Sequence, residues 1–423
     1  MRRLYSLLVW CAAPLAFGLV LWRGFKDRSY WQALPQRFGW GRMQPRPTLW
    51  VHAVSLGEVS AAAPLIRALL AAHPQTPLVL STATPAGRAR ALSLFGESGD
   101  IRFLPYDTPG AMRRFLQRVN PRVAVIMETE LWPNLYRECA RRGVSLLLAN
   151  ARLTPKSVAS YRRFAGLFRE IFSDNVLVAA QSSADAARFE EIGARNVRVA
   201  GNVKFDLAAD ASAAALGRLW RAQFGGRPIW IAGSTHAGED EAVLEAHRRL
   251  LADAPNAVLL LAPRHKERFE AVATLLQSGG FHFARRSAGD AMPLHHAVLL
   301  VDTLGELASM YAAADVAFVG GSLVPIGGHN LVEPAALGIP VLTGPYTSNS
   351  RDIAAQLLAC GAALEVRDAE QLAQELKRLF ANPDARVSMG AAGQRLVAAN
   401  RGSVQRLVEL TAPWWPADPS AAR

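Results

Sequence analysis

Residues 316–345 read VAFVGGSLVPIGGHNLVEPAALGIPVLTGP, and this stretch decides the fold class. Its first four residues are β-branched, small or aromatic and predict an inner parallel strand, which Gly320 and Gly321 end. A polar loop, a helix and a second apolar run follow, so the predicted order is strand, turn, helix, strand. Units of this order build α/β domains with a parallel sheet.

The loop of this stretch has the composition of an anion-binding site. Ser322 and the pair Gly327 and Gly328 leave backbone amides uncovered, and Asn330 stands at an N-cap position three residues before Glu333. Because first-turn amides lack intrahelical partners and the helix dipole is positive there, a phosphate would be held without a metal ion. The alternative is that the glycines serve only a tight crossover. No dinucleotide fingerprint opens a βαβ unit here, and no Walker motif occurs.

Length and composition exclude several classes of protein. A chain of 423 residues suits two domains of about 150–200 residues each, and an apolar fraction of 51% excludes a disordered chain. Cys11, Cys139 and Cys360 are too scattered for a disulfide framework or a thiolate metal site, which favours a reducing compartment. No pair of acids or histidines has the spacing of a metal site. We therefore expect neither a metal ion nor a cofactor.

The positive charge of the chain is concentrated at its amino terminus. The formal net charge is +12, and residues 1–50 hold eight lysines and arginines against Asp27 alone. A nucleic-acid-binding protein would more often spread its basic residues over one face. The pattern therefore favours an anionic membrane surface, and no nucleic acid, as the partner.

Residues 1–28 are predicted to form a single membrane anchor. Residues 4–22 carry no charge and have arginines on both sides, and such a run is long enough to enter or cross a bilayer. A cleaved signal peptide is the alternative, but the charges directly after the apolar run and the lack of a small-x-small cleavage site argue against it. Ser6 and Pro14 favour partial insertion over a simple span, and the sequence leaves open which occurs. The arginines and aromatic residues of 28–42 suit a headgroup layer.

Residues 29–206 are predicted to form the first α/β domain. From residue 48 onward, short apolar runs alternate with helix-like stretches, and a helix over 55–73 follows the first run. This repeated order implies a doubly wound parallel sheet, which binds ligands at the carboxyl ends of its strands. The predicted strands lie within residues 49–54, 77–84, 101–107, 123–130, 145–151, 176–181 and 197–202.

Charged residues follow three of these strands. Glu58 lies in the first turn after the first strand, where capping of the helix would by itself explain a surface carboxylate. Glu128 and Glu130 end an apolar strand, where a carboxylate costs desolvation unless it holds something. Hydrogen bonds to loop amides are the alternative for this pair. Lys204 follows the last strand.

Residues 228–423 are predicted to form the second α/β domain, after an alanine-rich linker over 207–227. Its strands lie within residues 228–235, 257–264, 297–302 and 316–319. Polar residues gather after each strand, so four strand ends would line one cleft. An isolated pair such as Arg264 and His265 is more often a solvated loop, but its neighbours favour a phosphate contact. The acidic run 239–241 has no partner at ligand spacing and is predicted to lie on the surface.

Seven ordered motifs cover nearly the whole chain: HAVSLGE (52–58), ETELWPN (128–134), GNVKFD (201–206), GSTHAGED (233–240), PRH (263–265), DTLGEL (302–307) and FVGGSLVPIGGHNLVEPAALGIPVLTGP (318–345). Together they resemble the Kdo transferases, the 3-deoxy-D-manno-octulosonic acid transferases of lipopolysaccharide assembly. The resemblance implies the GT-B fold, in which two Rossmann-like domains face a central cleft. It also implies CMP-Kdo as donor, a lipid A precursor as acceptor, and a place on the cytoplasmic face of the bacterial inner membrane.

The resemblance also implies roles for single residues. Glu58 matches the catalytic base, and Glu128 and Lys204 match positions that stabilise the transition state, with the choice between Glu128 and Glu130 left open. The first domain would bind the acceptor and the second the donor, with the last helix a candidate to pack back on the first domain. The residues that match CMP-binding segments are Pro263, Arg264, Leu304, Gly305, Glu306, Asn330, Leu331, Val332 and Glu333. We add Ser234, Thr235, His236, His265, Ser322, Gly328 and His329 on the donor side, and His52, Ser55 and Gly57 on the acceptor side.

The predicted reaction is a metal-independent transfer of Kdo from CMP-Kdo to a lipid A precursor (lipid IVA). A base is needed because the acceptor hydroxyl has a high pKa, and a single displacement should invert the anomeric configuration. Two alternatives stay open. One is a GT-B enzyme that uses a UDP-sugar, and the other is a non-catalytic membrane-bound protein that binds nucleotides. The sequence leaves open the number of Kdo residues added and the oligomeric state.

Overall fold

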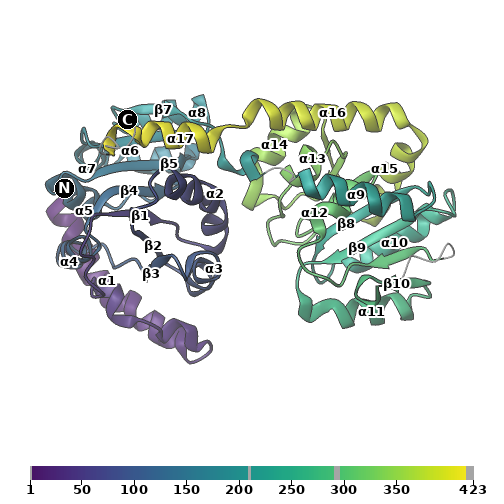
Figure 1. Ribbon diagram of the computed structural model, residues 1–423, viewed down its shortest axis with the longest axis horizontal. Helices are drawn as coiled ribbons and strands as arrows, with labels where there is room; N and C mark the ends of the chain where they lie inside the picture. Colours follow the sequence, from purple (N-terminus) through teal and green to yellow (C-terminus); the bar gives the residue numbers. More distant parts are fainter. Residues whose placement is uncertain (1, 208–210, 290–295, 416–423) are drawn as a thin grey trace. The chain divides into compact units, whose positions relative to one another are not determined.

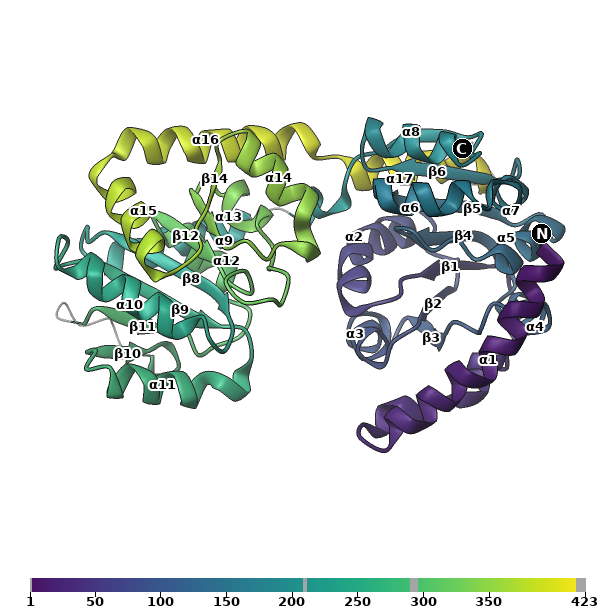
Figure 2. The ribbon, with the colours of Figure 1, turned by 180° about the vertical axis from the view of Figure 1, so that it is seen from behind.

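The computed structural model describes residues 2–207, 211–289 and 296–415, and the chain forms two compact units (Figures 1 and 2). The first unit consists of Met1–Asp206 with Arg401–Arg423, and the second of Leu207–Asn400. Each unit contains a seven-stranded sheet in which every neighbouring pair of strands is parallel. The prediction of two doubly wound α/β domains is therefore confirmed.

The first sheet has the strand order β3-β2-β1-β4-β5-β6-β7. The order reverses between β1 and β4, and open α/β sheets bind ligands at such a switch point, outside the carboxyl ends of the strands. The strands are β1 Thr48–His52, β2 Leu78–Thr82, β3 Gly99–Phe103, β4 Pro121–Met127, β5 Ser145–Ala151, β6 Val176–Ala180 and β7 Val197–Val199.

The second sheet has the order β10-β11-β9-β8-β12-β13-β14, and its switch point lies between β8 and β12. The strands are β8 Ile229–Thr235, β9 Val258–Pro263, β10 Phe283–Arg285, β11 Val298–Leu300, β12 Val316–Val319, β13 Val341–Thr343 and β14 Ala363–Glu365. β12 is the strand that the opening glycine-rich stretch predicted, and it ends where Gly320 begins.

Helix starts in the first unit follow signals that are readable in the sequence. Ser55, Thr84, Thr154 and Ser182 each accept a hydrogen bond from the amide three residues later, as N-caps do. The helices of this unit are α1 Arg2–Gly24, α2 Leu56–Ala72, α3 Pro85–Phe95, α4 Pro109–Val119, α5 Pro133–Arg141, α6 Pro155–Arg162, α7 Ala165–Ile171, α8 Ser183–Glu191 and α17 Ser403–Thr411. Those of the second unit are α9 Ala211–Gln223, α10 Asp240–Leu251, α11 Phe269–Ser278, α12 Leu307–Ala313, α13 Val332–Ala336, α14 Arg351–Ala359, α15 Ala369–Ala381 and α16 Pro383–Asn400.

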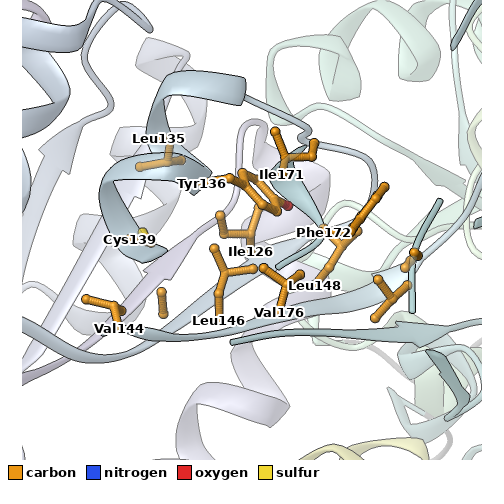
Figure 3. Close-up of a cluster of buried hydrophobic side chains, with 14 of the residues drawn as sticks. Ile126, Leu135, Tyr136, Cys139, Val144, Leu146, Leu148, Ile171, Phe172 and Val176 are labelled. Carbon is orange, nitrogen blue, oxygen red and sulfur yellow. The ribbon is translucent and has the colours of Figure 1, made fainter. Parts of the chain in front are cut away.

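The strands of the first sheet send alternate side chains into two separate cores. In β4, Ile126 joins one core and its neighbour Val125 joins the other. Figure 3 shows the first of these, where Ile126 and Leu148 of the sheet lie near Tyr136 of α5 and Phe172. Strands buried on both faces are apolar throughout, which is why they read as continuous apolar runs in the sequence. Each fully buried side chain of this size contributes about 1.5–3 kcal/mol to folding.

α1 lies along the surface of the first unit. In Figures 1 and 2 it begins beside α5 and runs past α4. The Tyr5 hydroxyl donates a hydrogen bond to the Asp107 carboxylate (2.8 Å), and the Ser6 hydroxyl donates to the side-chain oxygen of Asn134 (2.9 Å). Most of its other side chains are exposed, including Trp10 and Leu15. Among the described residues, α1 is the one helix long and apolar enough to cross a membrane.

Residues 207–227 differ from the predicted linker, because they contain α9, which packs against α12 within the second unit. Small side chains allow this contact: a Cβ on Gly217 would lie 2.3 Å from the Cβ of Ala312. An alanine-rich segment is therefore a packed helix here, although composition alone resembles a spacer.

The last helix, α17, belongs to the first unit and packs against α2. Its start is fixed by Asp206, whose carboxylate accepts hydrogen bonds from the backbone amides of Gly402 (2.7 Å) and Val404 (2.6 Å). Leu407 completes the contact inside the core that lies beneath α2. The second predicted domain, 228–423, thus ends near residue 400 in the structure.

Candidate active site

The first group of candidate residues lies at the switch point of the first sheet. Glu58 follows β1, and Glu128 and Glu130 follow β4, so neighbouring strands deliver all three carboxylates to one edge. They are close enough that the charges of Glu128 and Glu130 raise the pKa of Glu58. The sheet order therefore brings Glu58 close to two acids, Glu128 and Glu130, that lie about 70 residues later in the sequence.

Glu58 is held in a fixed position by its own helix start. Its carboxylate accepts hydrogen bonds from the backbone amide of Val54 (2.9 Å) and the hydroxyl of Ser55 (3.1 Å). The Ser55 hydroxyl in turn accepts from the amide of Glu58 (3.3 Å), which makes the pair a capping box. Helix capping, the alternative explanation for Glu58, does therefore occur, because the carboxylate caps the start of α2.

Capping alone would leave an ordinary acid, and Glu58 is not one. Its pKa is raised from 4.5 to about 7, chiefly by burial, against the opposing effect of the Val54 amide. The negative charges of Glu128 and Glu130 raise it further. A carboxyl group that titrates near neutral pH can accept a proton from a substrate and release it again, as a general base must.

Glu128 and Glu130 differ in their surroundings. Glu128 has a left-handed backbone (φ 59°) and forms an ion pair with Arg152 (Oε2 to Nε, 3.5 Å). Glu130 accepts a hydrogen bond from the indole nitrogen of Trp132 (2.8 Å), and burial raises its pKa. A non-glycine residue held at positive φ is strained, and such strain concentrates at functional sites.

Lys204 follows β7, an outermost strand of the same sheet, and lies in the short 3-10 helix Val203–Leu207. The turn that carries it is fixed by two asparagines. The side chain of Asn202 accepts the amide of Lys204 (3.0 Å), and that of Asn150, at the end of β5, accepts the amide of Val203 (3.2 Å). Asn150 also has a left-handed backbone (φ 55°), so the turn is built into the sheet edge.

Two of the acceptor-side candidates, His52 and Gly57, differ in their exposure to solvent. His52 is wholly buried, its Nδ1 lies 3.0 Å from the backbone oxygen of Ser81, and burial lowers its pKa to about 4. A side chain inside the sheet cannot touch an acceptor, so His52 supports β1 instead. Gly57 is exposed in the first turn of α2, and the nearest atom to an added Cβ would be the Ser55 hydroxyl at 3.9 Å. Protein packing does not require a glycine at that position.

In the second unit the loops after β8 and β12 are joined by one buried carboxylate. One oxygen of Glu239 accepts the amides of His236 (3.0 Å) and Gly321 (2.6 Å), and the other accepts those of Ser322 (2.9 Å) and Leu323 (2.8 Å). Glu239 is 0% exposed. A buried carboxylate is stable only when it is hydrogen-bonded, and here four amides satisfy it.

The predicted surface position of the acidic run 239–241 is therefore wrong for two of its three residues. Asp240 is also 0% exposed and forms an ion pair with Arg268, whereas Glu241 is exposed. Local spacing signals only one of the four hydrogen bonds of Glu239, the one from His236 three residues earlier, because the other three amides belong to the distant loop after β12. Arg268 was not a candidate, although its guanidinium also donates to the backbone oxygen of Thr235 (3.2 Å).

Histidines and an arginine gather at this edge. Nε2 of His236 lies 2.8 Å from Nε2 of His329, and the ring of His265 meets that of His236 edge-on at 5.3 Å. Burial lowers the pKa of His236 and brings that of His329 to about 4, helped by the positive charge of Arg264. Both rings are therefore neutral at neutral pH, and one donates its Nε2 proton to the other. Arg264 is exposed at the end of β9.

The glycine-rich loop does not leave its amides open as predicted. Gly327 and Gly328 donate their amides to the backbone oxygen of Gly321 (3.1 and 2.7 Å), and His329 donates to Gly320 (3.2 Å). The loop folds back on itself, since Gly321, Gly327 and Gly328 all adopt positive φ. The amides at Gly328 and His329 therefore shape the loop and are not free for a phosphate.

The next residues behave as a cap. The side chain of Asn330 accepts the amide of Val332 (3.1 Å) and donates to the carboxylate of Glu333 (3.0 Å). Burial raises the pKa of Glu333, and the nearby charge of Arg264 opposes that shift. The N-cap of α13 is Leu331, so the predicted N-cap position of Asn330 is wrong by one residue. The Asn330 side chain still satisfies the first amide of the helix and is hydrogen-bonded to the Glu333 carboxylate.

Several donor-side candidates are structural in this fold. The Ser322 hydroxyl is fully buried, donates to the backbone oxygen of Val319 (2.6 Å) and accepts the amide of Gly344 (2.8 Å). Candidate residues that are likewise buried are Thr235, Pro263, Leu331 and Val332. Because these side chains are buried, they cannot contact a ligand directly and instead pack beneath the loops of this edge. Ser234 remains partly accessible at the end of β8, with φ 59°.

The segment after β11 completes this edge. Leu304 is 68% exposed, Gly305 has φ 89°, and no atom lies within 4 Å of a Cβ added to Gly305. The Glu306 carboxylate accepts hydrogen bonds from Arg286 (2.8 Å) and from the Thr303 hydroxyl. The side chain of Leu304 and the space beside Gly305 are therefore open to solvent.

Among the described residues, no group of three or more histidine, cysteine or carboxylate side chains is placed to hold a metal ion. The edge of the second sheet thus presents Arg264, His265 and the His236–His329 pair, together with Asn330, Glu333 and Glu306. The edge of the first sheet presents Glu58, Glu128 and Glu130, with Arg152 paired to Glu128 and Lys204 after β7.

Comparison with known proteins gives one family match within each of the two units. The family described as 3-deoxy-D-manno-octulosonic-acid transferase (kdotransferase) matches residues 32–207, and the family described as glycosyl transferases group 1 matches residues 241–396. In solved structures, UDP-GlcNAc 2-epimerase from Neisseria meningitidis superposes with a TM-score of 0.54 over 86% of this chain and 99% of its own, at 15% identity. At that identity the likeness shows the fold alone.

Two doubly wound domains with a glycosyltransferase match define the chain as a glycosyltransferase of the GT-B fold. The 3-deoxy-D-manno-octulosonic acid transferase of Haemophilus influenzae is 38% identical over 98% of both chains, and that of Bordetella pertussis is 41% identical over 98% of this chain and 99% of its own. The chain belongs to the Kdo transferase family, and its activity is Kdo transfer in lipopolysaccharide biosynthesis. The resemblance of the seven motifs is thereby confirmed.

Proposed function

We propose that this protein moves Kdo from CMP-Kdo to a lipid A precursor (lipid IVA), with inversion and without a metal ion, and that Glu58 is the general base. One observation carries the proposal. Glu58 is a positioned carboxylate at the switch point of the first sheet, and its pKa is raised to about 7. Placing the base in the first unit assigns the acceptor to that unit and the donor to the second.

In this scheme Glu58 takes the proton of the acceptor hydroxyl while the hydroxyl oxygen attacks the anomeric carbon of Kdo. The bond from that carbon to the phosphate oxygen breaks, and CMP leaves with the electron pair. Attack from the face opposite the leaving group inverts the anomeric configuration. Arg264 and Lys204 would balance the charge on the phosphate, because cations at developing charge are the strongest stabilisers available to a metal-free site.

A membrane location supports the same proposal. α1 presents an exposed apolar surface, and the basic residues of 1–50 are suited to anionic lipids of the inner membrane on its cytoplasmic face. We propose that α1 is embedded along its length in the interface, since Tyr5 and Ser6 hold its first turns against the first unit. A helix held in this way keeps the protein beside its lipid substrate.

The decisive experiment incubates purified protein with CMP-Kdo and a tetraacylated lipid A precursor and identifies the products by mass spectrometry. A product heavier by one or more Kdo residues supports the proposal, and the number of additions is read from the same spectrum. Parallel incubations with UDP-sugars test a different donor. Transfer from a UDP-sugar but not from CMP-Kdo would remove the assignment of the donor.

The pH dependence of the reaction follows from the pKa of Glu58. A base must be ionised, so kcat/KM should fall about tenfold per pH unit below about pH 7 and reach a plateau above it. In the Glu130→Gln variant, the fall of kcat/KM should begin at a lower pH, because the charge of Glu130 helps to raise the pKa of Glu58. A rate that stays constant from pH 5 to pH 8 would contradict the assignment of Glu58 as the base.

Chelation tests the metal-free scheme. Initial rates measured in the presence of EDTA should equal those without it, and added Mg²⁺ or Mn²⁺ should not restore or increase transfer. If turnover instead requires a divalent ion at every pH tested, the charge on the departing phosphate is not balanced by protein cations alone.

A further inference from the structure

An apolar pocket of about 400 Å³ lies in the first unit between α1 and the segment α6–α7. α1 contributes Leu4, Tyr5 and Leu8 to one wall, and Tyr161, Phe164 and Phe168 form part of the other. Leu4, Leu8 and Phe164 are 61%, 60% and 54% exposed, so the pocket opens to the surface. An exposed apolar pocket of this size on a folded unit indicates a binding site.

One part of the pocket lining adjoins the candidate active site in the sequence. Leu131, in the loop that carries Glu128 and Glu130, and Pro133, the first residue of α5, both line the pocket. Glu130 is tied to this loop by the Trp132 indole (2.8 Å). Burial and the charge of Glu130 both raise the pKa of Tyr161, which lines the pocket, so the Glu130 carboxylate lies close to the pocket wall.

The wall formed by α1 is fixed and does not close the pocket. The Tyr5 hydroxyl is hydrogen-bonded to Asp107, and Arg2 forms an ion pair with Glu170 of α7 (3.4 Å). α1, which lines this pocket, is also long and apolar enough to enter a bilayer, so an α1 at the membrane would bring the pocket close to acyl chains. This favours a lipid over a soluble ligand as the occupant.

The charges around the pocket select among lipids. The segment 155–171 that forms its outer wall carries Lys156, Arg162, Arg163 and Arg169 against Glu170 alone. Arg162 keeps 67% of its side chain exposed although it pairs with Glu191 (3.1 Å). Basic residues on the segment that contributes one wall of an apolar pocket are complementary to a lipid whose headgroup carries phosphate.

We infer that this pocket binds one acyl chain of the anionic lipid acceptor, and so sets which hydroxyl of its headgroup reaches Glu58. The inference rests on the proposed function, since it assumes a lipid acceptor at the first unit. It predicts that acylation of the acceptor governs KM, because each buried methylene group strengthens binding about fourfold.

Two leucines of α1 provide a matched pair of variants. Leu8→Ser removes a side chain that lines the pocket, whereas Leu15→Ser removes an equally apolar, 78% exposed side chain of the same helix that does not. Both changes weaken insertion of α1 to a similar degree. Ser160→Phe adds a third variant, which fills the pocket from an exposed position on α6 and leaves the sequence of α1 unchanged.

Full-length variants are assayed in detergent micelles with the tetraacylated acceptor and with a soluble, fully deacylated analogue. We expect Leu8→Ser and Ser160→Phe to raise KM for the acylated acceptor about tenfold and to leave turnover of the deacylated one unchanged. Leu15→Ser should match the parent protein on both. Equal effects of Leu8→Ser and Leu15→Ser, or equal losses on both acceptors in Ser160→Phe, would overturn the inference. A parent protein that transfers Kdo to neither acceptor would instead remove the proposed function.

Discussion

Glu58→Gln is expected to lower kcat for Kdo transfer by about 10²–10⁴-fold, the usual contribution of a general base. The change keeps an oxygen that can accept the amide of Val54 and so retains much of the cap of α2. It removes only the ability to accept a proton. Binding of CMP-Kdo, measured by calorimetry, should stay within a factor of about two of the parent value, because the donor is assigned to the other unit.

The first unit supplies a control for this variant. Asp185 repeats the arrangement on α8, where its amide donates to the Ser182 hydroxyl (3.1 Å) and its carboxylate accepts the amide of Leu153 (3.0 Å). Asp185→Asn therefore removes a capping charge without touching the candidate base. We expect it to cost about 1 kcal/mol of stability and to leave kcat near the parent value. Comparable losses of kcat in both variants would mean that helix capping, and not base catalysis, explains Glu58.

Glu239→Gln is expected to be the most damaging conservative change in the second unit. A glutamine side chain has one oxygen and one NH2 group in place of two carboxylate oxygens. Two of the four backbone amides now bonded to Glu239 would therefore meet the NH2 group, which donates and cannot accept their hydrogen bonds. Each buried amide left without an acceptor costs about 1–3 kcal/mol. The loops after β8 and β12 should separate, and with them His236 and the turn that begins at Gly321.

The measured outcome is a loss of donor affinity. A cost of about 2 kcal/mol or more corresponds to a rise of about 30-fold in KM for CMP-Kdo, with a lower unfolding temperature. Glu241→Gln is the matched control, because it is an exposed acid on the same helix, and it should change neither quantity. If Glu239→Gln binds the donor as tightly as the parent does, the loops do not depend on this carboxylate.

The fold was largely predictable from the sequence because both sheets are buried on both faces. Strands such as β5 and β9 read as unbroken apolar runs, and Ser55 and Ser182 mark helix starts by a cap that is local in sequence. The short strands β10 and β14 escaped prediction, since three residues at a sheet edge carry too little pattern. α9 was mistaken for a linker because alanine content does not distinguish a spacer from a helix with a close neighbour.

The candidate site was predictable in part. Arg264 stands exposed at a strand end as expected. Asn330 accepts the first amide of α13 but lies one residue before the N-cap, Leu331, because the helix begins later than the spacing to Glu333 indicates. His52 and Ser322 were expected to face ligands, but both lie inside the fold, because a motif does not show which of its residues point inward. The amides of Gly327 and Gly328 were expected to be free, but the carbonyl of Gly321 accepts both.

By itself the sequence determined the class of fold, the order of strands and helices, and the family, because each depends on local periodicity and on motifs of neighbouring residues. Tertiary structure alone decided which polar groups are satisfied internally and which remain for chemistry. Glu239 and Glu58 illustrate the difference: both follow the first strand of a sheet, yet one is consumed by four amides and the other is left with a pKa near 7. Burial and the approach of distant backbone groups set that outcome, and neither is encoded in the spacing of residues along the chain.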